Sequence, residues 1–263
     1  MLTRWGIVVR LVRAWIVVAV LGLVACSEQG FGELDAPEPL PPLQPHVYAH
    51  DATTLYGVDL LTERVLALGG FHVTDGPGPL AIEDIALHPD GPLYAVSARA
   101  LYEVDPTSAE LTWICDVTGR ELVALTATAR GDLYAASMWG VYRLDPGDCR
   151  SPHELGSLGG YETTGDLVGP PDGRLFWLAF QGEALDHLMR IEGEDASYVD
   201  DLPGGHRGLS WFDDALWGFR FDGEVLRIDP DTGLVHAGFT TSVAWRGAAS
   251  WRELPRDFLP VAP

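Results

Sequence analysis

The chain has 263 residues and a formal net charge of −21, from 17 basic and 38 acidic residues. This length accommodates one large all-β domain or two small ones, and a hydrophobic content of 47% is enough for a sizeable core. So acidic a surface repels phosphate backbones and anionic lipid head groups. We therefore expect no nucleic acid among its partners.

Residues 1–25 have the layout of a secretory signal peptide, with three arginines ahead of an apolar run, Ala14 to Leu23. The segment between Arg13 and Cys26 is shorter than the roughly 20 apolar residues of a membrane-spanning helix. The alternative is an uncleaved anchor helix beginning near Trp5. That helix would place two arginines inside the bilayer, which is costly.

The signal segment ends in Leu23-Val24-Ala25-Cys26, which resembles the lipobox of bacterial lipoproteins. The resemblance implies cleavage before Cys26, lipidation of that residue and a stable membrane anchor of more than one acyl chain. Because Ser27 rather than Asp follows the cysteine, it also implies the outer membrane of a Gram-negative envelope. Residues 26–45 end in a proline-rich stretch, which predicts an extended tether.

A short apolar and aromatic phrase recurs about every 40 residues after position 46. Its copies are Val47-Tyr48-Ala49, Leu93-Tyr94-Ala95, Leu133-Tyr134-Ala135, Leu175-Phe176-Trp177 and Leu216-Trp217-Gly218. Short apolar runs separated by Pro, Gly and Asp turns, four to a repeat, are typical of β-propeller blades. The aromatic residue at the second position is expected to pack between neighbouring blades.

The repeats predict an all-β fold, a five-bladed β-propeller over residues 46–252, followed by a C-terminal tail at 253–263. No inner strand precedes the first copy, but Trp245–Ala249 is similar to the inner strand near Arg207, so the last strand is expected to complete the first blade. The irregular segment 69–82 is expected to form an extra strand or a loop over one face. The repeats resemble those of bacterial extracytoplasmic propellers of the YVTN, NHL and quinoprotein types, a resemblance that implies fold more than function.

Alignment of the inner strands predicts two groups of side chains at the mouth of the central channel. The acidic group is Glu83, Asp84, Glu121 and Asp166, and the group facing it is His206, Arg207, Trp245 and Arg246. The carboxylates are candidate ligands for Ca²⁺ or a candidate general acid, and the second group is a candidate clamp for a carboxylate or phosphate. The alternative is a ring of mutual ion pairs that closes the channel.

The chain shows no nucleophile elbow, phosphate-binding glycine loop or metal-binding histidine pair, so no catalytic residue is assigned. The leading hypothesis is a lipid-anchored binding or scaffold protein, which acts through the mouth and segment 69–82 on an unidentified protein or small molecule. The alternative is a divalent-cation-dependent lyase or lactonase that uses the mouth carboxylates. Cys115 and Cys149 form a candidate disulfide between adjacent blade rims, worth on the order of 3 kcal/mol.

Overall fold

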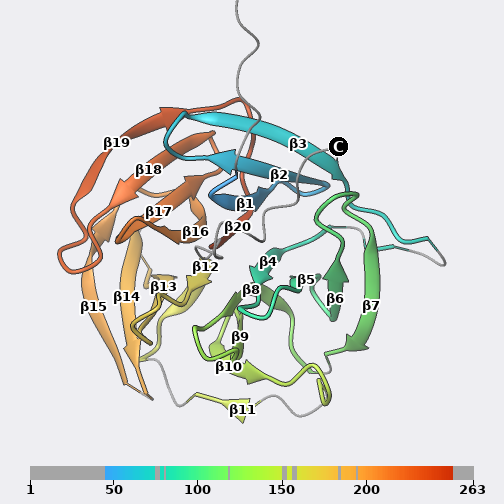
Figure 1. The fold of residues 1–263 in the computed structure, drawn as a ribbon. Coiled ribbons are helices and arrows are strands. Elements are labelled where there is room, and N and C mark those ends of the chain that lie inside the picture. The colour runs from blue at the N-terminus through green and yellow to red at the C-terminus, as the bar shows by residue number, and fades with distance from the viewer. Residues whose placement is uncertain are drawn as a thin grey trace, which may run out of the picture. The chain divides into compact units, whose positions relative to one another are not determined.

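A computed structural model describes residues 45–74, 78–79, 81–117, 119–149, 153–155, 159–182, 185–193 and 195–250. The signal segment, Cys26, most of the tether and the C-terminal tail lie outside the described residues. The described part is all-β and contains twenty strands in five four-stranded antiparallel sheets (Figure 1). No helix in this part of the chain is long and apolar enough to span a membrane.

The first two sheets show how the chain closes and then repeats. Blade 1 contains β20 (Gly247–Ser250), β1 (Val47–His50), β2 (Thr54–Asp59) and β3 (Arg64–Gly70). Blade 2 contains β4 (Asp84–Leu87), β5 (Leu93–Val96), β6 (Ala100–Val104) and β7 (Leu111–Asp116). In both blades the strands are given from the inside of the propeller outward.

The other three sheets follow the order of blade 2. Blade 3 contains β8 (Leu122–Ala127), β9 (Leu133–Ser137), β10 (Gly140–Leu144) and β11 (His153–Glu154). Blade 4 contains β12 (Glu162–Val168), β13 (Leu175–Phe180), β14 (Asp186–Glu192) and β15 (Asp195–Leu202). Blade 5 contains β16 (His206–Phe212), β17 (Ala215–Arg220), β18 (Glu224–Ile228) and β19 (Val235–Thr240).

The five innermost strands surround a common axis and neighbour one another in the order β20, β4, β8, β12 and β16 (Figure 1). The last strand completes the first blade, because β20 pairs antiparallel with β1, Ala249 opposite Tyr48. This confirms the predicted five-bladed propeller and its closure by the C-terminal strand. Closure leaves the first blade without an open inner edge.

The hydrophobic core lies between the blades as five clusters, each shared by two neighbouring sheets. The repeated aromatic residue belongs to one cluster in every blade: Tyr48, Tyr94, Tyr134, Phe176 and Trp217. Each packs against the next blade in the cycle, which confirms its predicted place in the core. The phrase therefore recurs in the sequence because each blade packs against its neighbour through the same positions.

Segment 69–82 contributes no further sheet strand within its described residues. Its start is held by Phe71, whose amide donates to the carbonyl of Thr53, and by a single parallel bridge between His72 and Glu110. Ile82, at its end, is buried in the cluster between blades 1 and 2. The described parts of the segment thus join blade 1 to the rim of blade 2.

Candidate functional site: the hub and mouth of the channel

Backbone pairing places one residue of each inner strand at a common level. Each pairs with the third position of the repeated phrase: Ile85 with Ala95, Leu125 with Ala135, Leu167 with Trp177, Leu209 with Gly218, and Ala248 with Ala49. An inner strand has no neighbour in its own sheet on the channel side. The amides that face the axis at this level need acceptors from elsewhere.

Two buried carboxylates supply those acceptors. Asp84 accepts from the amides of Ile85 at 2.8 Å and Leu125 at 2.6 Å. Asp166 accepts from the amides of Leu167 at 2.5 Å, Leu209 at 2.7 Å and Ala248 at 3.2 Å. One amide from every blade therefore donates a hydrogen bond to one of the two aspartates. We call the two carboxylates and these five amides the hub.

The hub aspartates also hydrogen-bond each other, which requires a proton between them. Burial, and then the charge of Asp166, raises the pKa of Asp84 well above its ordinary value. Burial raises the pKa of Asp166 to about 7, against the lowering effect of its bonds to Asp84 and the three amides. The pair therefore carries a proton near neutral pH, and its titration belongs to the pair rather than to either residue.

His50 is a titratable neighbour of the hub, with its Nε2 3.9 Å from Asp84 Oδ1. Its Nδ1 lies 2.7 Å from the carbonyl of Asp51, and burial lowers its pKa to about 4. The imidazole is therefore neutral at pH 7 and does not balance a carboxylate charge. The five amides and the shared proton perform that task.

Small residues make room for the aspartates. The position before the amide level holds Asp84 and Asp166 in two blades and Ala124, Gly208 and Gly247 in the other three. A Cβ atom on Gly247 would overlap both Asp84 Oδ1 and His50 Nε2. The absent side chain at this glycine is thus part of the hub.

One residue further out, five side-chain positions form a ring that we call the mouth: Glu83, Val123, Gly165, Arg207 and Arg246. Four of them agree with the sequence alignment. Blade 3 differs, because Val123 rather than Glu121 stands at this level and Ala124 rather than Leu122 stands beside the hub. The hairpins that follow the two strands have the same register, Leu87 opposite Leu93 and Ala127 opposite Leu133, so Val123 corresponds to Glu83 and Glu121 lies two positions before it. The predicted register of this strand was therefore wrong.

The four predicted carboxylates thus separate into different environments. Asp84 and Asp166 meet in the hub, whereas Glu83 pairs with Arg246, Oε2 to Nη1 at 3.3 Å. Glu121 is exposed and pairs with Arg99 at 3.1 Å. Across the described residues, no group of three or more histidine, cysteine, aspartate or glutamate side chains is arranged to hold a metal ion.

The mouth opens into a cavity of about 600 Å³. Besides the ring itself it is lined by Met138, Thr163, Thr164, Phe221, Ala244 and Trp245. Met138 lies in the turn between β9 and β10, and Phe221 lies in the turn between β17 and β18. The sequence interpretation did not single out these two residues, although an exposed apolar residue at a hairpin tip is a usable signal.

Arg207 and Arg246 have different partners in this cavity. Arg246 faces Glu83. Arg207 is exposed, donates from Nη1 to the carbonyl oxygen of Thr164 and has no carboxylate within 4.0 Å among the described residues. The mouth therefore has one arginine whose charge is compensated and one whose charge is not.

The other two members of the predicted clamp are buried. Trp245 is packed edge-on against Tyr56 and Phe219 while also bordering the cavity. His206 donates its amide to Asp186 Oδ2 at 2.8 Å and holds its ring Nδ1 3.4 Å from the same oxygen. Trp245 remains beside the arginines, whereas His206 is not among the residues that line the cavity.

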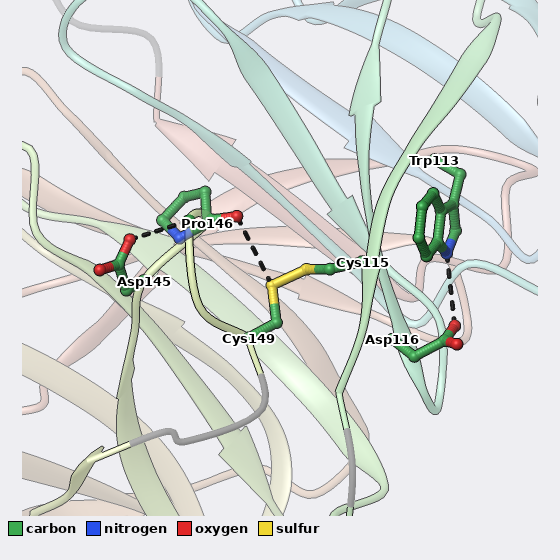
Figure 2. The surroundings of a disulfide bond; sticks show 7 residues. Trp113, Cys115, Asp116, Asp145, Pro146 and Cys149 are labelled. Atoms are coloured by element: carbon green, nitrogen blue, oxygen red, sulfur yellow. Dashed lines mark hydrogen bonds between the residues drawn. A yellow bond between two sulfur atoms is a disulfide. The ribbon is translucent and has the colours of Figure 1, made fainter.

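A disulfide joins Cys115 of β7 to Cys149, which follows β10 (Figure 2). The Cα atoms are 6.2 Å apart, and Cys149 is buried in the cluster between blades 2 and 3. In Figure 2 the bond runs between the rim of blade 2 and the turn of Pro146 in blade 3. The pairing is the one that the two remaining cysteines predicted.

No protein-family model and no curated protein matches this sequence. Solved structures do resemble it. A symmetrical protein from a study of de novo evolutionary emergence matches with a TM-score of 0.53 and 20% identity, over 78% of this chain and 97% of that one. A virginiamycin B lyase from Staphylococcus aureus matches with a TM-score of 0.46 and 16% identity, over 75% and 67% of the two chains.

A gluconolactonase from Xanthomonas campestris is similar as well, with a TM-score of 0.45 and 14% identity over 79% of this chain and 91% of that one. The likeness is to β-propellers. At these identities it concerns the fold alone, because one propeller scaffold hosts many unrelated activities. The function has to be argued from the hub and the mouth.

Proposed function

We propose that this protein is a lipid-anchored binding protein of the bacterial cell envelope, and that its ligand site is the mouth of the propeller channel. The observation that carries the proposal is that the polar groups of the hub already have partners, whereas one charged group of the mouth has none. The hub acids are occupied by backbone amides, whereas Arg207 borders an open cavity with no carboxylate partner among the described residues. A cavity with a few convergent polar groups is the usual form of a small-molecule site.

The envelope location is supported by four features of the chain. The sequence around Cys26 resembles a lipobox, and residues 26–45 have the composition of a tether. The Cys115–Cys149 disulfide is of the kind that persists in oxidising compartments such as the periplasm. Ser27 favours the outer membrane of a Gram-negative cell.

Metabolic labelling of the full chain with a fatty-acid analogue tests the anchor. We expect the wild-type chain to be labelled, to start at Cys26 and to sediment with the outer membrane, and the Cys26→Ala variant to be unlabelled. An unlabelled wild-type chain that retains Met1 would contradict the anchor. The Cys115→Ser variant serves as a control, because loss of the Cys115 thiol should not change the labelling.

The alternative is an enzyme that uses a divalent cation, such as Ca²⁺, bound by the mouth carboxylates. Such a site needs several carboxylate oxygens directed at one point. The oxygens of Asp84 and Asp166 already accept five amides, and Glu83 faces Arg246. The geometry therefore favours binding through the arginine side of the mouth over cation chemistry.

Retention of small molecules tests the binding role. The full chain is incubated with a small-molecule extract of bacterial cells, separated by size exclusion, and the retained compounds are identified by mass spectrometry. We expect compounds that wild type and Arg130→Glu retain and that Arg207→Glu loses. Arg130 is a matched control, since it is also exposed but lies in the turn between β8 and β9, outside the mouth lining. Equal retention by both variants, or none by wild type, would contradict the proposal.

A further inference from the structure

We propose that the ligand of the mouth is a small organic monoanion, a carboxylate carried on an aromatic or branched apolar group. This inference rests on the proposed binding function and names its ligand class. The carboxylate would sit on Arg207, and the apolar group would lie against Met138 and Phe221. Three properties of the mouth support this: its charge, its free space and its apolar border.

The charge of the mouth corresponds to one negative ligand group. Of the two arginines, Arg246 is balanced by Glu83 at 3.3 Å. Arg207 uses one guanidinium nitrogen for the carbonyl of Thr164 and keeps its other donors. A planar guanidinium with free donors binds a carboxylate through two parallel hydrogen bonds.

The free space lies next to the uncompensated arginine. Arg207 in blade 5 neighbours Gly165 in blade 4, and Val123 follows in blade 3. Gly165 projects no side chain, and a Cβ there would lie 3.0 Å from the carbonyl of His206 and 3.2 Å from Arg207 Cα. The glycine therefore allows the backbones of blades 4 and 5 to approach each other closely, and it places no acidic side chain beside Arg207.

The apolar border lies over the same blades. Met138 is 47% exposed and Phe221 is 62% exposed, and both line the cavity, as does the smaller Ala244. Exposed apolar side chains at the rim of a polar pocket are the groups that a ligand covers. Trp245 also lines the cavity, but its side chain is almost entirely buried.

The net charge of the whole chain excludes further classes of ligand. At a net charge of −21, the long-range field repels polyanions, and a single compensating arginine does not offset that repulsion. A monoanion with an apolar group gains from both Arg207 and the apolar border. A polyphosphate or nucleic acid would gain only from the arginine.

Fluorine NMR of para-fluorophenylacetate with the full chain tests this ligand class, with the uncharged para-fluorophenylacetamide as the matched probe. We expect saturable line broadening for the acid and at least about tenfold weaker binding of the amide. Arg207→Ala should weaken binding of the acid at least about tenfold, and Arg130→Ala should leave it within about twofold. Phe221→Ser, a change at an exposed turn, should weaken binding of both probes.

The inference fails if acid and amide bind equally, if Arg207→Ala binds the acid as wild type does, or if the acid shows no saturation up to about 10 mM. Should inorganic phosphate displace the acid at equal concentration, the apolar part of the proposal is wrong. Phe221→Ser keeps the test informative if Arg207→Ala does not fold. Retention of extract compounds alongside failure of the acid would overturn the ligand class only, whereas failure of both experiments would overturn the binding function.

Discussion

Asp84 of blade 2 and Asp166 of blade 4 meet in one hydrogen bond beside the channel axis, and both are fully buried. No arginine or lysine compensates them within 4.0 Å among the described residues, since the ion pair there involves only the neutral His50. Their partners are instead the backbone amides of all five inner strands. The acids that the sequence offered as metal ligands thus hold the blades to one another.

Removal of Asp166 should destabilise the propeller more than removal of any exposed acid. Asp166→Ala leaves three buried amides without acceptors, and each costs about 1 to 3 kcal/mol, so we expect a loss of at least about 3 kcal/mol. Asp166→Asn keeps one acceptor oxygen and should lose less. Urea unfolding of the full chain measures both, with the exposed Asp195→Ala as the control. Equal losses in Asp166→Ala and Asp195→Ala would show that the hub carries little stability.

The pH dependence of stability should reveal the hub proton. Both hub pKa values are raised above the ordinary 3.8, that of Asp166 to about 7, so their stabilising contribution is complete below about pH 3.8 and is lost as the pH rises through the raised values. His50 has the opposite effect on stability between about pH 4 and 6.5, because burial lowers its pKa to about 4. The charge of Asp51 raises this pKa and the charge of Arg246 lowers it. Above about pH 6.5 the hub effect stands alone, and the free energy of unfolding should fall by up to about 1.4 kcal/mol per pH unit.

Unfolding titrations of wild type and Asp84→Asn between about pH 6.5 and 8.5 measure this decline. The variant lacks the titrating partner of Asp166, so its profile should be flatter. A wild-type stability that stays constant or rises over this range would contradict a proton shared by the hub aspartates.

Gly247 should not tolerate even one added methyl group. In Gly247→Ala the new Cβ would overlap Asp84 Oδ1 and His50 Nε2, both of which are fixed by packing on all sides. We expect a loss of about 1 to 3 kcal/mol, as for other overpacked interiors. Gly70→Ala is the matched control, because its Cβ would meet only the carbonyl of Thr53 at 3.8 Å. Thermal unfolding compares the two variants, and similar unfolding midpoints would indicate that the hub can accommodate an added methyl group.

Loss of the disulfide should lower stability by about 3 to 4 kcal/mol in the chain-entropy model, because it closes a loop with a sequence separation of 34. The double variant Cys115→Ser/Cys149→Ser avoids a lone thiol and is the form to measure. Chemical unfolding of the double variant should agree with that of reduced wild type. If oxidised and reduced wild type unfold at the same denaturant concentration, the bond contributes nothing to the fold.

The sequence was sufficient for the blade repeat because the phrase around Tyr94 records a packing contact that every blade must make. It was also sufficient for the closure of blade 1 and for the Cys115–Cys149 pair. It was insufficient for the register of β8, because residues 83–87 and 121–125 have similar letters, whereas the hairpin pairing makes Val123 the counterpart of Glu83. Glu121 therefore aligned with Glu83 in sequence but lies outside the mouth.

The role of the hub aspartates was hidden for a different reason. In sequence, Asp84 and Asp166 are carboxylates in a predicted channel, and carboxylates there are read as ligands. Their true partners are backbone amides, which every residue possesses and which leave no trace in composition. Met138 and Phe221 were missed because turn residues were expected to be polar.

The central claim is that the channel acids hold the blades together and leave the arginine side of the mouth to the ligand. Thermal unfolding of the full chain at constant ionic strength, with Ca²⁺ raised from zero to about 5 mM, tests it most directly. The account predicts an unfolding midpoint that does not change with Ca²⁺, in wild type and in Asp84→Asn alike. A saturable rise in the wild-type midpoint that Asp84→Asn abolishes would contradict it and would restore the cation site.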